Sequence, residues 1–324
     1  MAGDCVIGVD LGGTKIYTAL AGADGQVLAE VKIPTEAAGG ESHVIARIVD
    51  SCRTVRATAG ALAGRVAAVA VGAPGPLDTK SGVIHCAPNL KWHGVPLKRL
   101  LEEALGEPVF IDNDANLAAL GEYVYGAGRG MRDMIFIAVS TGIGGGLILN
   151  GRLYRGAADG AGEIGHMVVL PDGPLCSCGN RGCLEAVASG TALAAQAGEL
   201  IGQGCGAGIL AAAGGDPARV SAAAVAAAAA AGDGEAVLLL ERAGRCLGIA
   251  VANTANLLNP EMVVIGGGVA GSGELLFAPA RREVERSALE PARSTIKIVR
   301  AALGGRAGVS GAVALALEKA AGGA

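Results

Sequence analysis

Apolar runs and glycine-rich polar loops alternate along the chain, and one such arrangement occurs twice. The first copy consists of an apolar run at residues 6–9, a polar loop at 10–15, a second apolar run at 16–20 and a turn at 24–25. The second copy consists of the apolar runs 135–139 and 147–149, the loop 140–146 between them and a turn at 150–151. Both copies predict two strands joined by a glycine-rich hairpin and followed by a tight turn. The repetition predicts two similar α/β domains that face each other across a cleft.

The other apolar patterns have either the period of a helix or that of a strand. They predict helices at 44–61, 96–105 and 309–319, further helices rich in alanine and leucine between 189 and 259, and strands at 66–71, 109–111 and 262–265. Glycine and proline at 72–76 predict a loop. Alternating strands and helices are typical of α/β proteins with parallel or mixed sheets.

Composition and charge narrow the class of protein. Hydrophobic residues make up 51% of the 324 residues and charged residues 17%, which is enough apolar surface for a large core. The formal net charge is -4 and no long basic run occurs, so we expect neither nucleic acid nor an anionic membrane as a partner. No basic, apolar leader precedes Asp10, and no apolar run reaches the roughly 18 residues of a membrane span. We therefore expect a cytoplasmic protein.

Two loops carry residues suited to phosphate. The first reads Asp10-Leu11-Gly12-Gly13-Thr14-Lys15. Glycines let the backbone approach a phosphate and point N–H groups at it, an aspartate at a strand end can hold magnesium, and a threonine can donate to a phosphate oxygen. The Walker A pattern G-x-x-x-x-G-K-[ST] is absent. An ordinary hairpin with a glycine turn is the alternative, but the second loop, Thr141 to Gly146, favours an ATP clamp between two lobes.

A third glycine run, Gly266-Gly267-Gly268, follows the predicted strand 262–265. Together with Gly271 it matches the dinucleotide fingerprint G-x-G-x-x-G. Too little chain follows Gly271 for the rest of a Rossmann domain, so we prefer a glycine-lined contact to adenosine at a helix start.

One cluster has the composition of a metal site. His166, Cys176, Cys178 and Cys183 offer one imidazole and three thiols within 18 residues. Such a set suits a tetrahedral zinc ion with no open position, and hence a structural rather than a catalytic metal. Three unligated thiols are the alternative, since the Cys-x-Cys spacing is tighter than that of zinc fingers.

Polar residues follow the predicted strand 109–111 in the order Asp112-Asn113-Asp114-Ala115-Asn116. A carboxylate that enters a cleft here can accept the proton of an attacking hydroxyl group. Capping of the next helix is the alternative, but capping needs one Asp or Asn, and this segment has four in five positions.

Glu163 and His166 have the Glu-x-x-His spacing of di-iron bundles. Those bundles need a second copy and further glutamates on helices, whereas this pair lies among glycines. With Glu185, we interpret the two residues as groups that hydrogen-bond sugar hydroxyls.

In these motifs the chain resembles the ROK family of sugar kinases over nearly its full length. The matching segments are 10–15, 72–76, 113–116, 140–146, 162–166, 176–185 and 266–268. The run from Gly162 to Glu185 is the most specific of them, and its order with the other motifs leaves little room for chance.

The resemblance implies an α/β, two-lobed actin-like ATPase fold of the ribonuclease H-like type with an inter-lobe cleft. A small lobe would cover 1–113, joined by the C-terminal helix 306–324, and a large lobe with the zinc loop would cover 114–305. The implied activity is ATP-dependent phosphorylation of a hexose at the 6-hydroxyl, most like that of the family's glucokinases, with Mg²⁺ and a structural Zn²⁺. The family is often dimeric or tetrameric, so a homodimer or homotetramer is expected.

The family's motifs also imply site residues. Asp114 would be the general base. Sugar hydroxyls would contact Asn89, Asn113, Asp114, Glu163, His166 and Glu185. ATP would contact Asp10, Gly12, Gly13, Thr14, Lys15, Thr141, Gly142, Gly266, Gly267 and Gly268. Zinc would be held by His166, Cys176, Cys178 and Cys183.

Three other readings stay open. Within the family, the substrate could be N-acetylmannosamine, N-acetylglucosamine, fructose or allose. Many ROK members are sugar-sensing repressors with an N-terminal winged helix, for which a phosphate loop that begins at Asp10 leaves no room. A catalytically inactive sugar-binding protein is the third, and intact Asp10, Thr14 and Asp114 argue against it.

Overall fold

Two five-stranded sheets form the frame of the protein, which a computed structural model describes over residues 4–322. The first sheet has the order β3-β2-β1-β4-β8, and the second has the order β11-β10-β9-β12-β13. The first comprises β1 (Cys5–Leu11), β2 (Lys15–Gly22), β3 (Val27–Pro34), β4 (Val66–Ala73) and β8 (Val109–Asn113). The second comprises β9 (Met134–Val139), β10 (Ile143–Leu149), β11 (Arg152–Tyr154), β12 (Met262–Gly266) and β13 (Lys297–Arg300).

The two sheets share one topology. In each, the first two strands form an antiparallel hairpin, and the first strand lies parallel to the fourth. The fifth strand extends the parallel part in both sheets. The predicted repeat is confirmed, and because of it the two glycine-rich hairpins occupy equivalent ends of the two sheets.

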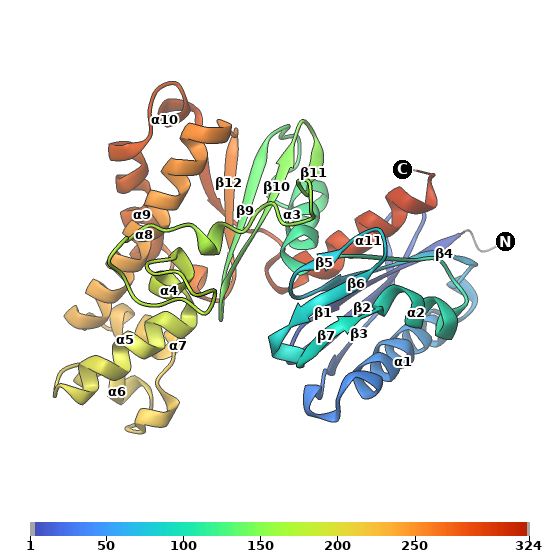
Figure 1. Cartoon of the computed structure of the whole chain (residues 1–324), viewed down its shortest axis with the longest axis horizontal. Coiled ribbons are helices and arrows are strands. Elements are labelled where there is room, and N and C mark those ends of the chain that lie inside the picture. The colour runs from blue at the N-terminus through green and yellow to red at the C-terminus, as the bar shows by residue number, and fades with distance from the viewer. Residues whose placement is uncertain (1–3, 323–324) are drawn as a thin grey trace.

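Helices cover both faces of each sheet (Figure 1). They are α1 (Glu41–Ala59), α2 (Leu97–Leu105), α3 (Asp114–Tyr125), α4 (Leu184–Ala188), α5 (Gly190–Gly202), α6 (Ala207–Ala212), α7 (Ala222–Ala230), α8 (Gly234–Leu258), α9 (Glu274–Ser287), α10 (Ala292–Thr295) and α11 (Ala307–Ala320). Figure 1 shows α11, in red, beside the blue N-terminal strands, so the end of the chain returns to the first sheet. We call this unit the small lobe and the unit around the second sheet the large lobe.

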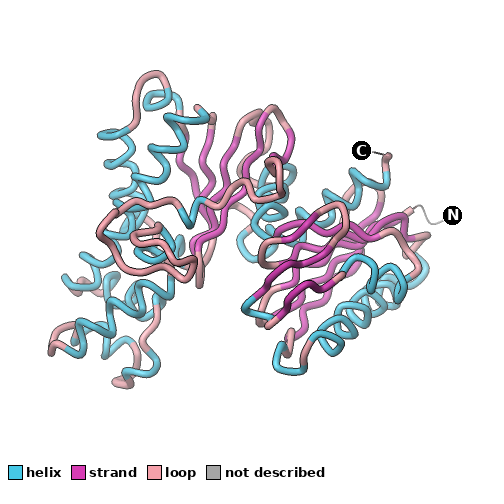
Figure 2. The backbone as a smooth tube through the Cα atoms, in the orientation of Figure 1, coloured by secondary structure: helices cyan, strands magenta, loops and turns pink. Residues whose placement is uncertain are grey.

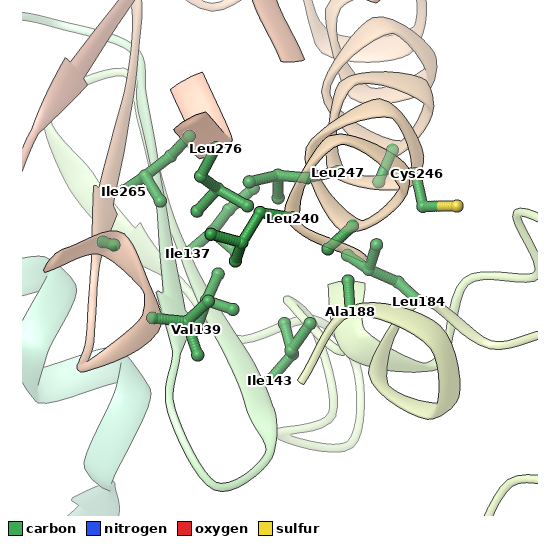
Figure 3. Packing of buried hydrophobic residues seen from close by; sticks show 14 of the residues in the cluster. Ile137, Val139, Ile143, Leu184, Ala188, Leu240, Cys246, Leu247, Ile265 and Leu276 are labelled. Carbon is green, nitrogen blue, oxygen red and sulfur yellow. The ribbon is translucent and has the colours of Figure 1, made fainter. Parts of the chain in front are cut away.

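The large lobe has the biggest core. Figure 3 shows Ile137 and Val139 of β9 packed against Leu240 and Leu247 of α8, with Ile265 of β12 beside them. All five side chains are buried. This packing fixes the strand that leads into the second hairpin.

Helix α3 lies between the lobes. Its Leu117 and Leu120 belong to the small-lobe cluster with α11, while Ala119 packs with β9 and β10. The helices α3 and α11 touch through glycines: a β-carbon on Gly311 would lie 1.6 Å from the Leu117 carbonyl oxygen. The start of α3 is therefore held close to both sheets.

Several boundaries differ from the predictions. The predicted helix 44–61 is α1, which begins earlier, at Glu41, and ends at Ala59. Gly72 and Ala73, predicted in a loop, complete the buried strand β4. Strands β3 and β13 and helix α9 were not predicted, nor was the small sheet of β5 (Leu77–Asp78), β6 (Val83–Ala87) and β7 (Trp92–Val95). No single helix within residues 4–322 is long and apolar enough to span a membrane; α7 and α8 pass that test only as a pair bent by 117°.

Candidate active site

The backbone of the first hairpin is held by hydrogen bonds, whereas residues at its tip are exposed to solvent. The Gly12 amide donates to the Lys15 carbonyl oxygen at 2.9 Å and closes the turn between β1 and β2. Buried Thr35 holds this turn, because its hydroxyl donates to Gly12 O at 2.6 Å and its amide donates to Thr14 O at 3.0 Å. Thr14 and Lys15 are exposed. The turn is thus rigid and presents polar groups to solvent.

Asn89 lies beside this turn, and Asp10 of β1 lies beside the start of α11. A β-carbon on Gly13 would lie 3.1 Å from the Asn89 β-carbon, and one on Gly308 at the start of α11 would lie 2.8 Å from Asp10 Oδ1. Burial raises the pKa of Asp10, and the charge of Lys15 partly opposes the rise. A half-buried carboxylate of this kind suits a bound cation, since the cation would offset the cost of its ionisation.

The second hairpin is tied to α4 by a carboxylate. Glu185 Oε2 accepts a hydrogen bond from the Ile143 amide at 2.8 Å. A β-carbon on Gly142 would lie 2.4 Å from the same oxygen, so a larger residue there would displace the Glu185 carboxylate. On the other side, the Thr141 carbonyl oxygen accepts from the amide and hydroxyl of Thr191 at 3.2 and 2.9 Å.

A cavity of about 610 Å³ opens beside this hairpin. It is lined by Ser140, Thr141, Gly190, Thr191, Ala194, Val220, Ser221, Ala222, Ala223, Ala226, Gly268, Val269, Gly271 and Ser272. Gly268 of the third glycine run is thus placed beside Thr141 of the second hairpin. Gly267 supports this arrangement, because it has a φ of 89° and a β-carbon there would lie 2.2 Å from Val139 O. The small, largely apolar walls and the size suit a nucleoside.

The four polar residues at 112–116 differ in their hydrogen bonds. Asn113 caps α3, and its side-chain oxygen accepts from the amides of Ala115 and Asn116 at 2.9 and 3.3 Å. Asp112 is 1% exposed and binds Arg155 at 2.7 Å and the side-chain amide of Asn116 at 3.0 Å. Among the described residues, the Asp114 carboxylate accepts hydrogen bonds from backbone amides only, that of Ala115 at 2.8 Å. Capping therefore explains one of the four residues, and the Asp114 carboxylate is left available.

The environment of Asp114 changes its proton affinity. Its pKa is raised from 3.8 to about 7, first by burial and then by the negative charges of Asp10 and Glu163. The two carboxylates come from β1 and from the loop after β11, so three separate segments converge at one place. A carboxyl group with a pKa near neutrality is suited to proton transfer.

Glu163 and His166 lie at the two ends of a short 3₁₀ turn, with Glu163 exposed and His166 half-buried. His166 Nε2 faces Glu163 Oε2 at 4.0 Å, while its Nδ1 faces Cys176 Sγ at 3.6 Å. One ring edge thus points to Glu163 and the other to Cys176.

The four predicted metal ligands come together. The ligand atoms of His166, Cys176, Cys178 and Cys183 all lie within 4.8 Å of one another. Cys178 Sγ and Cys183 Sγ are 3.6 Å apart, too far for a disulfide bond of about 2.05 Å. A tetrahedral zinc ion with bonds of about 2.1 to 2.3 Å places its ligands roughly 3.5–3.8 Å apart. The 3.6 Å separations of Cys176 Sγ from His166 Nδ1 and of Cys178 Sγ from Cys183 Sγ match this spacing, so the donor set fits zinc.

Comparison with known proteins identifies the family. The model of the ROK family matches residues 6–319. The chain belongs to the ROK family. It is 38% identical over 320 residues to a glucokinase from Thermotoga maritima, covering 97% of this chain and 98% of that protein.

Two further relatives show the range of the ROK family. The crystal structure of a ROK glucokinase from Streptomyces griseus in complex with glucose and AMPPNP matches with a TM-score of 0.82 and 36% identity, over 96% of this chain and 98% of that one. A xylose repressor from Caldicellulosiruptor bescii is 32% identical over 97% of this chain and 78% of the repressor. The chain therefore has the two-lobed actin-like ATPase fold of ROK kinases.

Some residues of this ROK site had no signal in the sequence. Part of the wall of the nucleoside-sized cavity comes from α5, α7 and the turn before α7. In the sequence, the alanines of these segments indicated only helices. Arg155 was not predicted as a site residue, because it lies 43 residues after Asp112 and no sequence motif links the two. The polar run at 112–116 did indicate a functional segment, but it could not show which residue caps α3, which pairs with Arg155 and which is available for catalysis.

Proposed function

We propose that this ROK-family protein transfers the γ-phosphoryl group of ATP to the 6-hydroxyl group of glucose. The observation that carries the proposal is the available Asp114 carboxyl group, which has a pKa of about 7 and lies where β1, α3 and the loop after β11 converge. The similarity to glucokinases over almost the whole chain supports the same activity.

ATP is proposed to bind across both lobes. The adenosine would occupy the 610 Å³ cavity against Gly266, Gly267 and Gly268, which leads the triphosphate towards Thr141 and Gly142. The first hairpin would receive the phosphates from the other lobe through Asp10, Gly12, Gly13, Thr14 and Lys15. Mg²⁺, held by the ATP phosphates and Asp10, would neutralise charge on the transferred group.

Asp114 is proposed as the general base. It would accept the proton of the 6-hydroxyl as the new O–P bond forms, while the bond from the γ-phosphorus to the bridging oxygen breaks and ADP leaves. Asn113 keeps its side-chain NH₂ for the sugar, since its oxygen is used in the helix cap. Asn89, Glu163, His166 and Glu185 would bind the other hydroxyl groups.

The zinc ion is proposed to have a structural role. Four protein ligands leave no open position for chemistry. Zinc would hold the loop 166–183 together and, through His166, fix the ring edge that faces Glu163. The expected cytoplasmic location and homo-oligomeric state stay predictions.

A coupled assay of ADP release tests the substrate. With ATP and magnesium, glucose should have the highest kcat/KM in a panel that includes mannose, fructose, allose, N-acetylglucosamine and N-acetylmannosamine. Faster turnover of an N-acetylated sugar with no turnover of glucose would contradict the proposal. Sugar binding without any ADP release would instead support a sugar-sensing protein.

A further inference from the structure

One loop of the large lobe is bonded to the small lobe at two points. We call residues 155–162, between β11 and Glu163, the strap. Figure 2 shows it in pink as the start of the long loop segment that leaves β11, and Figure 1 shows β11 on the side of the large lobe that faces β5 and β6. Inside the strap, the Ala161 amide donates to the Arg155 carbonyl oxygen at 3.0 Å, so it forms a closed turn.

The first bond lies at the start of the strap. Arg155 Nη2 and Nε lie 2.7 and 2.8 Å from Asp112 Oδ2. Asp112 is 1% exposed and is the next-to-last residue of β8 in the small lobe. Its other oxygen accepts from the Asn113 amide at 2.8 Å and from the Asn116 side-chain amide at 3.0 Å. Loss of Arg155 would leave a buried carboxylate without its counter-charge, which is strongly unfavourable.

The second bond lies in the middle of the strap. Asp159 Oδ2 accepts hydrogen bonds from both the amide and the hydroxyl of Thr79, at 2.8 and 2.9 Å. Thr79 follows β5 in the small lobe. Asp159 has a φ of 55°, in the left-handed region that favours glycine. An aspartate at such a position retains a less favourable backbone conformation, and its carboxylate makes both bonds to the other lobe.

The last residue of the strap, Gly162, directly precedes Glu163, one of the two carboxylates whose charges act on Asp114. Gly162 packs on β10 so closely that a β-carbon there would lie 2.9 Å from Gly145 O. Glu163 follows directly, and its charge raises the pKa of Asp114. The strap therefore links the small lobe, through Asp112 and Thr79, to Glu163, whose charge acts on Asp114.

We propose that the strap is a positioning element that sets the approach of Glu163 to Asp114 when the two lobes hold a hexose. This inference rests on the proposed function. Arg155 and Asp159 are its positioning residues and Thr79 is its anchor on the small lobe. ATP binds elsewhere in the cleft, so the strap acts on the sugar and on turnover but not on the affinity for ATP.

The test replaces Asp159 with glycine, which suits a positive φ and removes both bonds to Thr79. We expect Asp159→Gly to raise the KM for glucose about tenfold, less than the full effect of two charge-assisted hydrogen bonds because Arg155 still holds the strap. The variant should also have a lower kcat and an unchanged KM for ATP. Asp159→Asn, which keeps an acceptor oxygen and tolerates positive φ, should restore near-wild-type kinetics. Thr79→Val should add little in the Asp159→Gly background, because the bond is already gone.

Arg155→Met tests the other bond, and Arg152→Met on β11, which is exposed, is its matched control. Only the Arg155 change should raise the KM for glucose. Unchanged glucose kinetics in Asp159→Gly, or an equal rise in the KM for ATP, would overturn the positioning role.

Hydrogen exchange tests the strap without relying on glucose turnover. In Asp159→Gly the amides of Thr79 and of residues 156–163 should exchange faster, while those of α8 keep their rates. Equal exchange in variant and wild type would overturn the strap even if the enzyme is active. Faster exchange at these amides, together with a wild type that does not phosphorylate glucose, would support the strap and contradict the proposed function.

Discussion

Replacing Asp114 with asparagine should remove the general base while it leaves the fold intact. Asparagine has nearly the same size and can still accept from the Ala115 amide, but it cannot take a proton from the sugar. Loss of a general base lowers kcat by a factor of about 10²–10⁴, and the KM for glucose should change much less. In the wild type, kcat/KM should fall as the pH drops below about 7, since the pKa of Asp114 is about 7 and the base must be ionised.

The same variant should be more stable than the wild type above neutral pH. The pKa of Asp114 is raised from 3.8 to about 7 in the folded protein, so the unfolded chain ionises this group more readily. The cost to the folded state therefore appears as the pH rises above about 4, and it is complete above about 7. A shift of this size corresponds to about 4 kcal/mol. Because the side chain is only half-buried, we expect solvent to reduce the gain of Asp114→Asn to about 1–2 kcal/mol at pH 8.

Urea unfolding at pH 8 and pH 4.5 measures this gain. The control is Asp50→Asn, at an aspartate on α1 whose side chain is 71% exposed and which should give no such pH-dependent gain. A gain at pH 8 that shrinks towards pH 4.5 supports the reasoning. A variant with no gain at pH 8 would refute the account of the Asp114 pKa, and near-wild-type kcat would remove Asp114 from the mechanism.

Three further changes test other parts of the site. The purified protein should contain about one zinc per chain by elemental analysis, and Cys178→Ser should lose zinc, thermal stability and glucose binding; zinc-free protein with full activity would contradict this. Ala226→Leu, in the wall of the 610 Å³ cavity, should raise the KM for ATP about tenfold and leave the KM for glucose unchanged, whereas exposed Ala227→Leu on the same helix should alter neither. Gly142→Ala would place a β-carbon 2.4 Å from Glu185 Oε2, and we expect kcat/KM to drop at least about tenfold; normal kinetics would show that this contact is dispensable.

Local signals in the sequence predicted the parts of the fold that depend on local chemistry. The two glycine-rich hairpins were predicted because glycine, β-branched runs and Asn-Gly or Asp-Gly turns occur in the same order twice. The grouping of His166, Cys176, Cys178 and Cys183 was predicted from residue type and spacing alone, and the side-chain N and S atoms of these four candidate ligands do converge. Helix α9 was missed. Pro279 lies inside it and breaks the helical pattern, but Leu276 and Phe277 are buried against the large-lobe core, and this packing outweighs the local preference.

The sequence could not predict contacts between distant segments. Asp112 and Arg155 are 43 residues apart, and Thr79 and Asp159 are 80 residues apart. No spacing rule links such pairs, because only the relative placement of the two sheets brings them together. The raised pKa of Asp114 has the same origin, since it depends on burial and on charges from two other segments.

Analysis of the reaction product by NMR tests the central claim most directly. The protein is incubated with glucose, ATP and magnesium, and the ³¹P and ¹³C spectra of the product locate the new phosphate ester. The account predicts a single product with phosphorus coupled to C6, formed together with ADP and absent when Asp114→Asn replaces the wild type. Phosphate on C1, or no phosphorylated glucose beside rapid phosphorylation of N-acetylmannosamine, would contradict it.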